Sequence, residues 1–320
     1  MRFLKFLITV IVVAFAAVFV FAGPASAQGV PSAASLTSGY AAAIASDVAA
    51  SVYDPSLHKE IWVTGDVTQV GSTSTVGYFG YPHNALVEET PGSSAFTTET
   101  FNTEQYGTDY WAGVPDTSHF YQFVPTWTDG TYFWPALVID EGATLHVIGE
   151  RIQGVDPFTV VGTYDAQLNA STLAFESVTA VPSQSGDNWS GYAPASGGYW
   201  LTSQQGEVAW VPTGDLDVSA DWVLYPGAAP SAGGSWPVAN GSTWNLFTAV
   251  YGGAYAEEYT STAMTGPWEG PSNILALIVP QTDGGIVAHP DLPAPAGKVL
   301  ISYDVNNSTT YDPQFAYVSK

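Results

Sequence analysis

The sequence predicts an all-β fold, and three observations support this prediction. Short runs rich in Val, Ile, Tyr, Trp and Thr are bounded by Gly, Pro, Asn and Asp, a pattern typical of strands separated by turns. The 32 glycines and 22 prolines are spread along the whole chain, as many tight turns require. No amphipathic segment of three helical turns follows the first 27 residues. The expected strands include Glu60–Thr64, Thr144–Ile148, Phe158–Tyr164, Gly206–Val211, Leu246–Tyr251 and Lys298–Tyr303.

A chain of about 290 residues built from short strands can close as a double sandwich, a β-helix or a propeller. No short period is visible, which counts against a β-helix. Aromatic-rich segments recur roughly every 50–60 residues, which corresponds to about 58 residues for each of five four-stranded blades. These segments lie around Trp62, Trp111–Trp134, Trp189–Trp210, Trp244 and Trp268. The pattern favours a five-bladed β-propeller in a single domain, because no low-complexity linker divides the chain.

The first 27 residues have the features of a cleaved export signal. Arg2 and Lys5 precede an apolar run from Phe6 to Ala22, and the small residues Ala25-Ser-Ala27 follow a Gly-Pro break. The alternative is a membrane anchor, but the apolar run of about 17 residues is short for a ~30 Å hydrocarbon core. We therefore expect a signal peptide over 1–27, a lead-in that is helical or extended over 28–44, and a propeller over 45–320. Export predicts a secreted, extracellular protein without a membrane partner.

Composition narrows the classes of partner. The chain has 6 basic and 29 acidic residues, and loss of 1–27 leaves 4 basic ones, so the formal charge becomes 4 − 29 = −25. Nucleic acid is excluded as a partner, because phosphate binding needs clustered Lys and Arg. The absence of cysteine excludes disulfides and thiolate metal sites. A strongly negative protein also repels anionic polymers, so a neutral polysaccharide or oligosaccharide is the expected ligand.

Two aspartates on either side of an expected hairpin are the candidate catalytic residues. Asp47 precedes the turn at Asp54-Pro55, and Asp66 follows the run Glu60-Ile-Trp-Val-Thr-Gly65. Residues far apart in sequence approach one another across such a turn, since neighbouring strands lie about 4.8 Å apart. Glycoside hydrolysis needs two carboxyl groups that flank the scissile bond. The alternative is that both aspartates bind backbone amides at a turn and a strand end.

Four further side chains are candidates for substrate binding, each with a structural alternative. Asn84, in the run Tyr81-Pro-His-Asn84, could face a ligand or belong to an ordered loop. Trp134 could offer its ring to a sugar or lie in the core. Arg151, the one arginine after residue 27, could hold a carboxylate ionised near the active centre or form an ordinary ion pair with Glu150, Asp156 or another acid.

His289 is the fourth candidate, and Pro290 after it favours extended backbone. His289, Tyr303 and Asn306 could point to one centre, and the alternative is that His289 is structural. No nucleophile elbow, zinc motif or phosphate loop is present, and the five histidines have no metal-ligand spacing. We therefore predict no metal site and no cofactor, and the sequence leaves open a structural calcium ion on the axis.

Three segments in the last part of the chain form a specific motif: Thr265-Gly-Pro-Trp268, Ala288-His-Pro-Asp-Leu292 and Leu300-Ile-Ser-Tyr-Asp-Val-Asn-Asn307. Together they resemble the last blade of a bacterial family of five-bladed propellers related to glycoside hydrolases, which includes endo-D-arabinanases. Upstream, Ile61-Trp-Val-Thr-Gly-Asp66 is similar to the first blade, Phe133-Trp-Pro135 to the second, and Glu207-Val-Ala-Trp-Val-Pro212 to a later one. His83-Asn84-Ala85 also resembles a family segment. The match extends over about residues 45–307.

The resemblance implies that Asp47 and Asp66 lie at the mouth of the central funnel. It thus implies a glycoside hydrolase of arabinan-type cell-wall polysaccharide, with Asp47 as general base or nucleophile and Asp66 as its acid partner or pKa-tuning neighbour. Val67 stands where the family usually has Thr, and Trp210 stands where Arg is frequent. These differences keep a second hypothesis in place, a propeller that binds carbohydrate or another surface without turnover.

Overall fold

The computed structural model describes residues 44–69, 83–89, 99–101, 123–154, 158–183, 188–231, 233–250, 252–278, 285–306 and 311–320. The expected signal peptide and residues 28–43 of the lead-in lie outside these ranges. Within them, no helix is long and apolar enough to cross a membrane. Residues 44–50 are extended, so over these positions the strand alternative for the lead-in is the right one.

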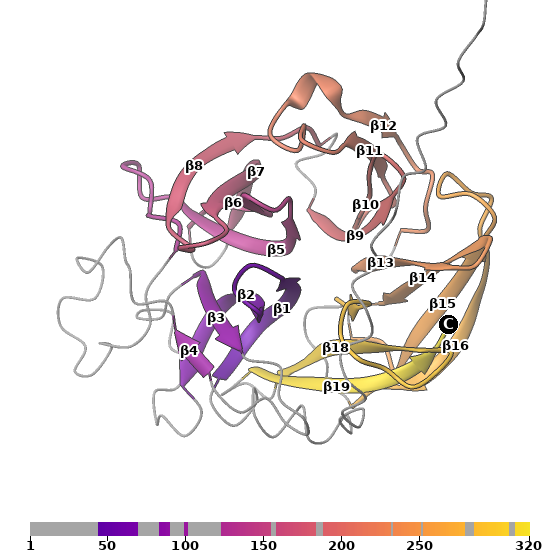
Figure 1. Ribbon diagram of the computed structural model, residues 1–320. Helices are drawn as coiled ribbons and strands as arrows, with labels where there is room; N and C mark the ends of the chain where they lie inside the picture. The colour runs from indigo at the N-terminus through magenta and orange to yellow at the C-terminus, as the bar shows by residue number, and fades with distance from the viewer. Residues whose placement is uncertain are drawn as a thin grey trace, which may run out of the picture.

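The chain is a five-bladed β-propeller (Figure 1). Each blade is an antiparallel meander in which strands follow one another in chain order. Blade 1 contains β1 (Ile44–Asp54), β2 (Lys59–Gln69), β3 (Ala85–Glu89) and β4 (Glu99–Phe101). Blade 2 contains β5 (Tyr132–Asp140), β6 (Thr144–Gln153), β7 (Thr159–Asn169) and β8 (Phe175–Ala180). Blade 3 contains β9 (Trp189–Ala195), β10 (Gly198–Ser203), β11 (Val208–Pro212) and β12 (Val223–Tyr225).

The last two blades complete the ring. Blade 4 contains β13 (Ser235–Asn240), β14 (Thr243–Ala249), β15 (Tyr255–Ser261) and β16 (Glu269–Ala276). Blade 5 contains β17 (Val287–His289), β18 (Lys298–Asn306) and β19 (Tyr311–Ser319). A short 3-10 helix, η2 (Ser219–Asp221), precedes β12.

The first strand of every blade lies nearest the axis. β1, β5, β9, β13 and β17 contact one another in a closed ring, while the later strands extend outward (Figure 1). Glycine allows close approach where β9 meets β13, because a Cβ atom on Gly191 would lie 2.2 Å from the carbonyl oxygen of Ser235. Bulky apolar side chains fill the space between blades, and Trp62, Trp189 and Trp236 are fully or almost fully buried.

Two contacts join the last blade to the first and show their relative direction. Ser51 Oγ and His289 Nδ1 lie 2.9 Å apart, and the Tyr53 amide donates to Asp291 Oδ2 over 2.8 Å. Both contacts join residues that are 238 positions apart. A constant offset between two strands means that β1 and β17 run in the same direction, side by side. The beginnings of these two inner strands therefore lie at the same end of the axis.

Each of the six expected strand segments overlaps an observed strand, but the expected spacing of blades needs correction. Trp244 and Trp268 both belong to blade 4, so the aromatic recurrence does not mark one blade each. The turn Thr265–Trp268 likewise lies between β15 and β16 of blade 4, whereas His289 and residues 300–306 belong to blade 5. The reason is that aromatic residues also fill a second apolar cluster between blades 3 and 4, in which Trp200 of blade 3 lies with Trp244 and Trp268 of blade 4.

Candidate active site in the axial hollow

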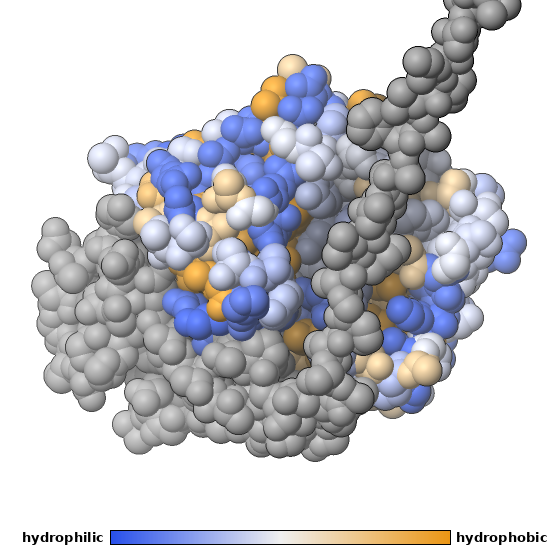
Figure 2. Space-filling model, viewed as in Figure 1, coloured by the Kyte–Doolittle hydropathy of each residue, from blue (hydrophilic) through white to orange (hydrophobic). Residues whose placement is uncertain are grey.

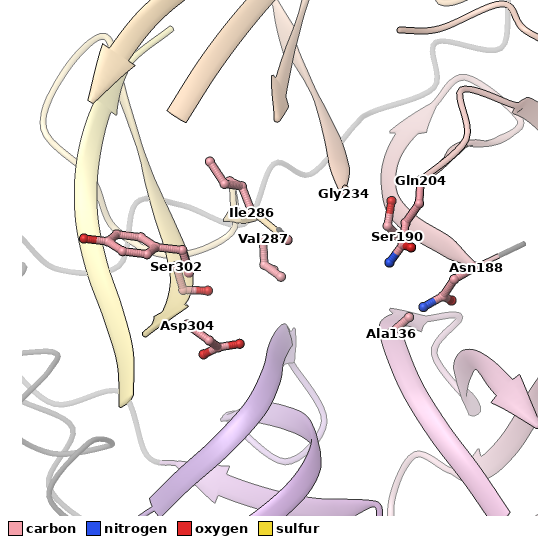
Figure 3. Close-up of a pocket in the computed structure, with 11 residues that line it drawn as sticks. Ala136, Asn188, Ser190, Gln204, Gly234, Ile286, Val287, Ser302 and Asp304 are labelled. Carbon is pink, nitrogen blue, oxygen red and sulfur yellow. The ribbon is translucent and has the colours of Figure 1, made fainter. Parts of the chain in front are cut away.

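A hollow that is partly open to solvent lies at the end of the axis where β9, β13 and β17 begin. We call it the axial hollow, and four blades contribute to it. The described residues that line it are Ala136, Asn188, Ser190, Gln204, Gly234, Gly285, Ile286, Val287, Ser302, Tyr303 and Asp304. Figure 3 shows Asp304 and Ser302 on the blade 5 side, with Asn188, Ser190 and Gln204 facing them from blade 3.

The polar groups of this lining suit a neutral, hydroxylated ligand. Asn188 and Gln204 carry amides, Ser190 and Ser302 carry hydroxyls, and Asp304 is the one carboxylate among the described lining residues. No Lys, Arg or His is part of that described lining. Amides and hydroxyls both donate and accept hydrogen bonds, as sugar hydroxyls do. An anionic ligand would find no cation in the described lining to offset its charge.

The two predicted catalytic aspartates lie on neighbouring strands. β1 and β2 pair as the expected hairpin, and Asp47 is opposite Gly65, the residue before Asp66. Bulges interrupt the register of β1 on both sides of Asp47. The structure describes the backbone of the two aspartates but not their side chains, so the proximity of their carboxyl groups stays a prediction.

The parallel register of β1 and β17 relates Asp47 to the axial hollow. If the offset of 238 residues is continued toward the beginnings of both strands, Asp47 comes level with Gly285. Gly285 lines the hollow. The bulges of β1 shift this alignment slightly, but they do not move Asp47 to the other end of the strand. The alignment therefore predicts that Asp47 lies at the end of β1 that is nearest the hollow.

His289 is near this site but does not line it. The ring is fully buried and packs on Trp62, with the ring centroids 5.1 Å apart. Its two nitrogens lie 2.9 Å from Ser51 Oγ and 2.8 Å from Ser302 Oγ. Burial lowers the pKa of His289 to about 3, so the ring is neutral in ordinary buffers. Ser302 lines the hollow, and His289 contacts Ser302 from the side away from the hollow. The prediction that His289 contacts the substrate directly is therefore wrong for the described residues.

Asn84 was expected to bind substrate, and the structure corrects this expectation. The side chain is fully buried, and its amide donates to the carbonyl oxygens of Phe133 (3.0 Å) and Val124 (3.4 Å). Its oxygen accepts from the Val124 amide over 2.8 Å. Asn84 thus joins blade 1 to the entrance of blade 2, because buried backbone groups need partners that no strand supplies there.

Arg151 forms an ordinary ion pair, as one of the two predictions for it stated, and its partner is Asp129. Its guanidinium donates to Asp129 Oδ2 (2.5 Å) and Thr131 Oγ1 (2.7 Å), and it lies 4.6 Å from the centre of the Trp127 ring. Hydrogen bonds from Thr131, and then the charge of Arg151, lower the pKa of Asp129. These contacts fix the segment before β5. Arg151 is not among the residues that line the hollow.

Trp134 also faces its own blade. Its ring meets Phe158 edge to face with the centroids 5.6 Å apart, and Trp134 does not line the hollow. The expected sugar platform is therefore not at the axial hollow. Phe158 is half exposed, at 51% of its surface, whereas the Trp134 ring is partly covered by it.

Sequence reasoning missed most of the residues that line the axial hollow. Asn188, Ser190 and Gln204 lie next to strand ends of blade 3, and Ser302 and Asp304 lie on β18. Tyr303 was named as part of one centre with His289 and does line the hollow, while the side chain of Asn306 is outside the described set. A signal did exist, because the polar residues Ser302 and Asp304 alternate with Ile301 and Tyr303 along a strand, and residues two positions apart share a face.

At the end of blade 2 where β5 finishes, beside blade 3, lies a buried group of ionisable side chains that we call the His146 cluster, made of Glu141, His146 and Asp165. His146 Nδ1 lies 2.8 Å from Asp165 Oδ2, and Nε2 lies 3.4 Å from Glu141 Oε2. Glu141 also accepts from the Gly214 amide of blade 3 over 2.9 Å. Burial opposes protonation of His146, but Asp165 and then Glu141 outweigh it and raise its pKa. Burial likewise raises the pKa of Asp165.

Comparison with known proteins supports the propeller fold of this chain, and it shows which enzymes share that fold. No family model matches the chain, and no curated protein matches it in sequence. A Bacteroides ovatus protein with a provisional hydrolase assignment superimposes with a TM-score of 0.62 at 16% identity, over 86% of this chain and 85% of that one. The exo-β-1,3-galactanase of Phanerochaete chrysosporium, solved with galactose, gives 0.54 at 8% identity, over 85% of this chain and 60% of that one.

A β-xylosidase gives a TM-score of 0.52 at 10% identity, over 87% of this chain and 93% of that one. The galactanase and the xylosidase are glycoside hydrolases of the family 43 type with five-bladed propellers, whereas the Bacteroides ovatus protein has only the provisional hydrolase assignment. The chain spans only 60% of the length of the galactanase, and all identities are low, so the likeness concerns the propeller.

Proposed function

We propose that the chain is a secreted glycoside hydrolase that cleaves a neutral polysaccharide at the axial hollow. The observation that supports this proposal is the parallel arrangement of β1 and β17, whose offset, when continued to the beginnings of both strands, aligns Asp47 with Gly285 of the hollow lining. Asp47 acts as general base or nucleophile, and Asp66 on the neighbouring strand acts as its acid partner or tunes its pKa. Two close carboxyl groups do not ionise equally, and this difference separates an acid from a base.

The lining of the hollow supports a neutral substrate. Sugar hydroxyls can exchange hydrogen bonds with Asn188, Gln204 and Ser302, while Ile286 and Val287 offer apolar surface to the C–H face of a ring. Arabinan-type cell-wall polysaccharide is the substrate that the family resemblance favours. Galactan and xylan belong in the same test, because structural neighbours are named as a galactanase and a xylosidase.

The alternative function is carbohydrate binding without turnover. One observation favours it, since Asp304 is the one carboxylate among the described lining residues, and hydrolysis needs two. Arg151 and Asn84, which were expected near the funnel, are engaged in structural contacts.

Both functions are tested by incubating the full-length secreted chain with arabinan, arabinogalactan, galactan and xylan and analysing the products. The proposal expects new reducing ends from at least one polymer, and loss of this activity in Asp47→Asn and Asp66→Asn. Full activity in both variants contradicts the catalytic assignment. Retention of a polymer by the wild-type chain without any products selects the binding function.

A further inference from the structure

We propose that Asp304 is a catalytic carboxylate of this site, placed across the axial hollow from Asp47, and that it acts as the general acid. This inference rests on the proposed function and extends it to a residue on another blade. It rests on three observations: the register of blade 5, the face of the sheet on which Asp304 lies, and its position in the lining of the hollow.

The register of β17 and β18 places Asp304 at the same level as Asp47. The pairs Val287–Ser302, Ala288–Ile301 and His289–Leu300 fix the antiparallel alignment. When it is continued by two residues, Gly285 comes opposite Asp304. The parallel alignment of β1 with β17 brings Asp47 level with the same Gly285. Gly285, two residues before β17, is therefore aligned with Asp304 by the register of β18 and with Asp47 by the offset of β1.

The face of the blade 5 sheet that carries Asp304 is turned toward blade 1. Ser302 and Asp304 are two residues apart on β18 and so share a face. Ser302 Oγ lies 2.8 Å from His289 Nε2, and the other nitrogen of that ring reaches Ser51 Oγ of β1. His289 thus lies between the Ser302 face and blade 1. Asp304 extends this face toward the beginning of β1, where Asp47 lies.

The space between the two aspartates is suited to a substrate. Gly285 has no side chain, so β17 leaves room at the level where the two aspartates flank it. Asp304 is partly exposed and lines the hollow, and Figure 3 shows its side chain directed from β18 into it. Asn188 and Gln204 face it from blade 3, where they can hold sugar hydroxyls. A glycosidic bond held in the hollow would have Asp304 on one side, and the proposal assigns the other side to Asp47 of β1, since hydrolysis requires two carboxyl groups.

The proposed hydrolysis needs no reactant other than the polysaccharide and water. Protonated Asp304 gives its proton to the glycosidic oxygen while the bond from that oxygen to the anomeric carbon breaks. Water supplies the hydroxyl that ends on the anomeric carbon, and its remaining proton returns to the pair of carboxyl groups. Asp66, which follows the residue paired with Asp47, is then left to tune the pKa of Asp47.

The experiment compares Asp304→Asn with wild type on two substrates, the polysaccharide cleaved by wild type and a nitrophenyl glycoside of the same sugar. A nitrophenolate leaves without help from an acid. We expect kcat/KM on the polysaccharide to fall by roughly 10²–10⁴-fold, the range of a lost acid or base, and on the nitrophenyl glycoside to fall far less. Asp221→Asn, on the exposed helix η2, is the matched control and keeps wild-type values on both substrates.

Three results overturn the inference or its basis, and they differ from one another. Undiminished polysaccharide hydrolysis by Asp304→Asn refutes the inference while the proposed function stands. Equal losses on both substrates that come from KM alone make Asp304 a binding residue and also refute the acid role. Absence of hydrolysis by the wild type refutes the proposed function itself. If thermal melting shows that Asp304→Asn is not folded, Asp304→Ala replaces it in the same assay on both substrates, and the same outcomes apply.

Discussion

The two ends of the propeller use their polar side chains differently. At the end where β5 finishes, the His146 cluster pairs charged groups with one another and with a backbone amide of blade 3. At the end where β9, β13 and β17 begin, small and polar residues surround the axial hollow. On the face shown in Figure 2, hydrophobic residues form small separate patches among hydrophilic ones.

This difference separates structural from functional polar groups. Buried polar groups are costly unless they are bonded, so a cluster that bonds within itself stabilises the junction of two blades. Groups that line a hollow are also within reach of a ligand, even where they bond inside the protein as Ser302 does to His289. The residue type does not distinguish the two cases, since Asn84 joins two blades whereas Asn188 lines the hollow.

The largest effect is expected at the hollow, from Asp47→Asn. We expect hydrolysis to fall by roughly 10³-fold with little change in thermal melting, because the substitution keeps the shape and removes the charge. Reducing-end release and melting temperature are measured on the same preparation. Loss of folding together with activity would instead assign Asp47 to a structural role.

The next effect is on stability, from Asn84→Ala. The buried Val124 amide loses its partner, and the carbonyl of Phe133 loses a donor. A buried group without a partner costs about 1–3 kcal/mol, so urea unfolding is expected to shift to lower concentrations by that amount. Asn273→Ala, on the exposed strand β16, is the control with no shift. A change of KM without a change of stability would contradict the structural role and assign Asn84 to substrate binding.

The His146 cluster predicts that stability falls as the pH rises. The folded state raises the pKa of His146 above the ordinary histidine value of about 6.5. The folded state therefore binds the proton more tightly than the unfolded chain, and this stabilisation is complete below pH of about 6.5 and lost as the pH rises through the folded pKa. Unfolding free energies across this window in wild type and His146→Gln give the test. The slope should be smaller in the variant, and an unchanged slope would contradict the prediction.

His289 predicts a change of the opposite sign. Its pKa is lowered to about 3 by burial, so the folded state disfavours its proton. The stabilisation is complete above pH of about 6.5 and is lost as the pH falls toward 3. Acid unfolding of wild type and His289→Gln, monitored by tryptophan fluorescence, measures this. The variant should be less stable at neutral pH and show a weaker acid slope, and an equal slope would show that another group causes it.

The smallest effect is expected from Arg151→Lys. The pair with Asp129 is near the surface, since Asp129 is 56% exposed, and such pairs contribute about 0–1 kcal/mol. We expect a loss of stability within that range and an unchanged KM, because Arg151 does not line the hollow. Steady-state kinetics on the cleaved polymer provide the measurement. A KM raised severalfold would connect Arg151 to the substrate after all.

Local pattern predicted the fold better than the site. Gly and Pro spacing and β-rich runs are local, and they indicated the strands and the propeller. The β1–β2 hairpin was also predictable, because the turn at Asp54-Pro55 is local. Asp304 was quoted within a motif but not assigned a role. Its place depends on contacts between residues 238 positions apart, which no local pattern contains.

The candidates that proved structural share a physical reason. Asn84 and His289 have the donors and acceptors that a ligand site needs, but the same groups satisfy buried backbone and serine atoms. Arg151 was correctly considered as an ion pair, while its partner Asp129 was not named in advance. Whether a polar side chain is occupied by its own protein depends on packing between blades, which the sequence does not display.

The central claim is that a neutral sugar is bound between β1 and β18 at the axial hollow. The most direct measurement is a crystal structure of Asp47→Asn with an oligosaccharide from the polymer that wild type cleaves. The account predicts a sugar in the hollow with its glycosidic oxygen within hydrogen-bond distance of Asp304. A sugar bound only on the outer strands of the blades, with the hollow free of it, would contradict the account.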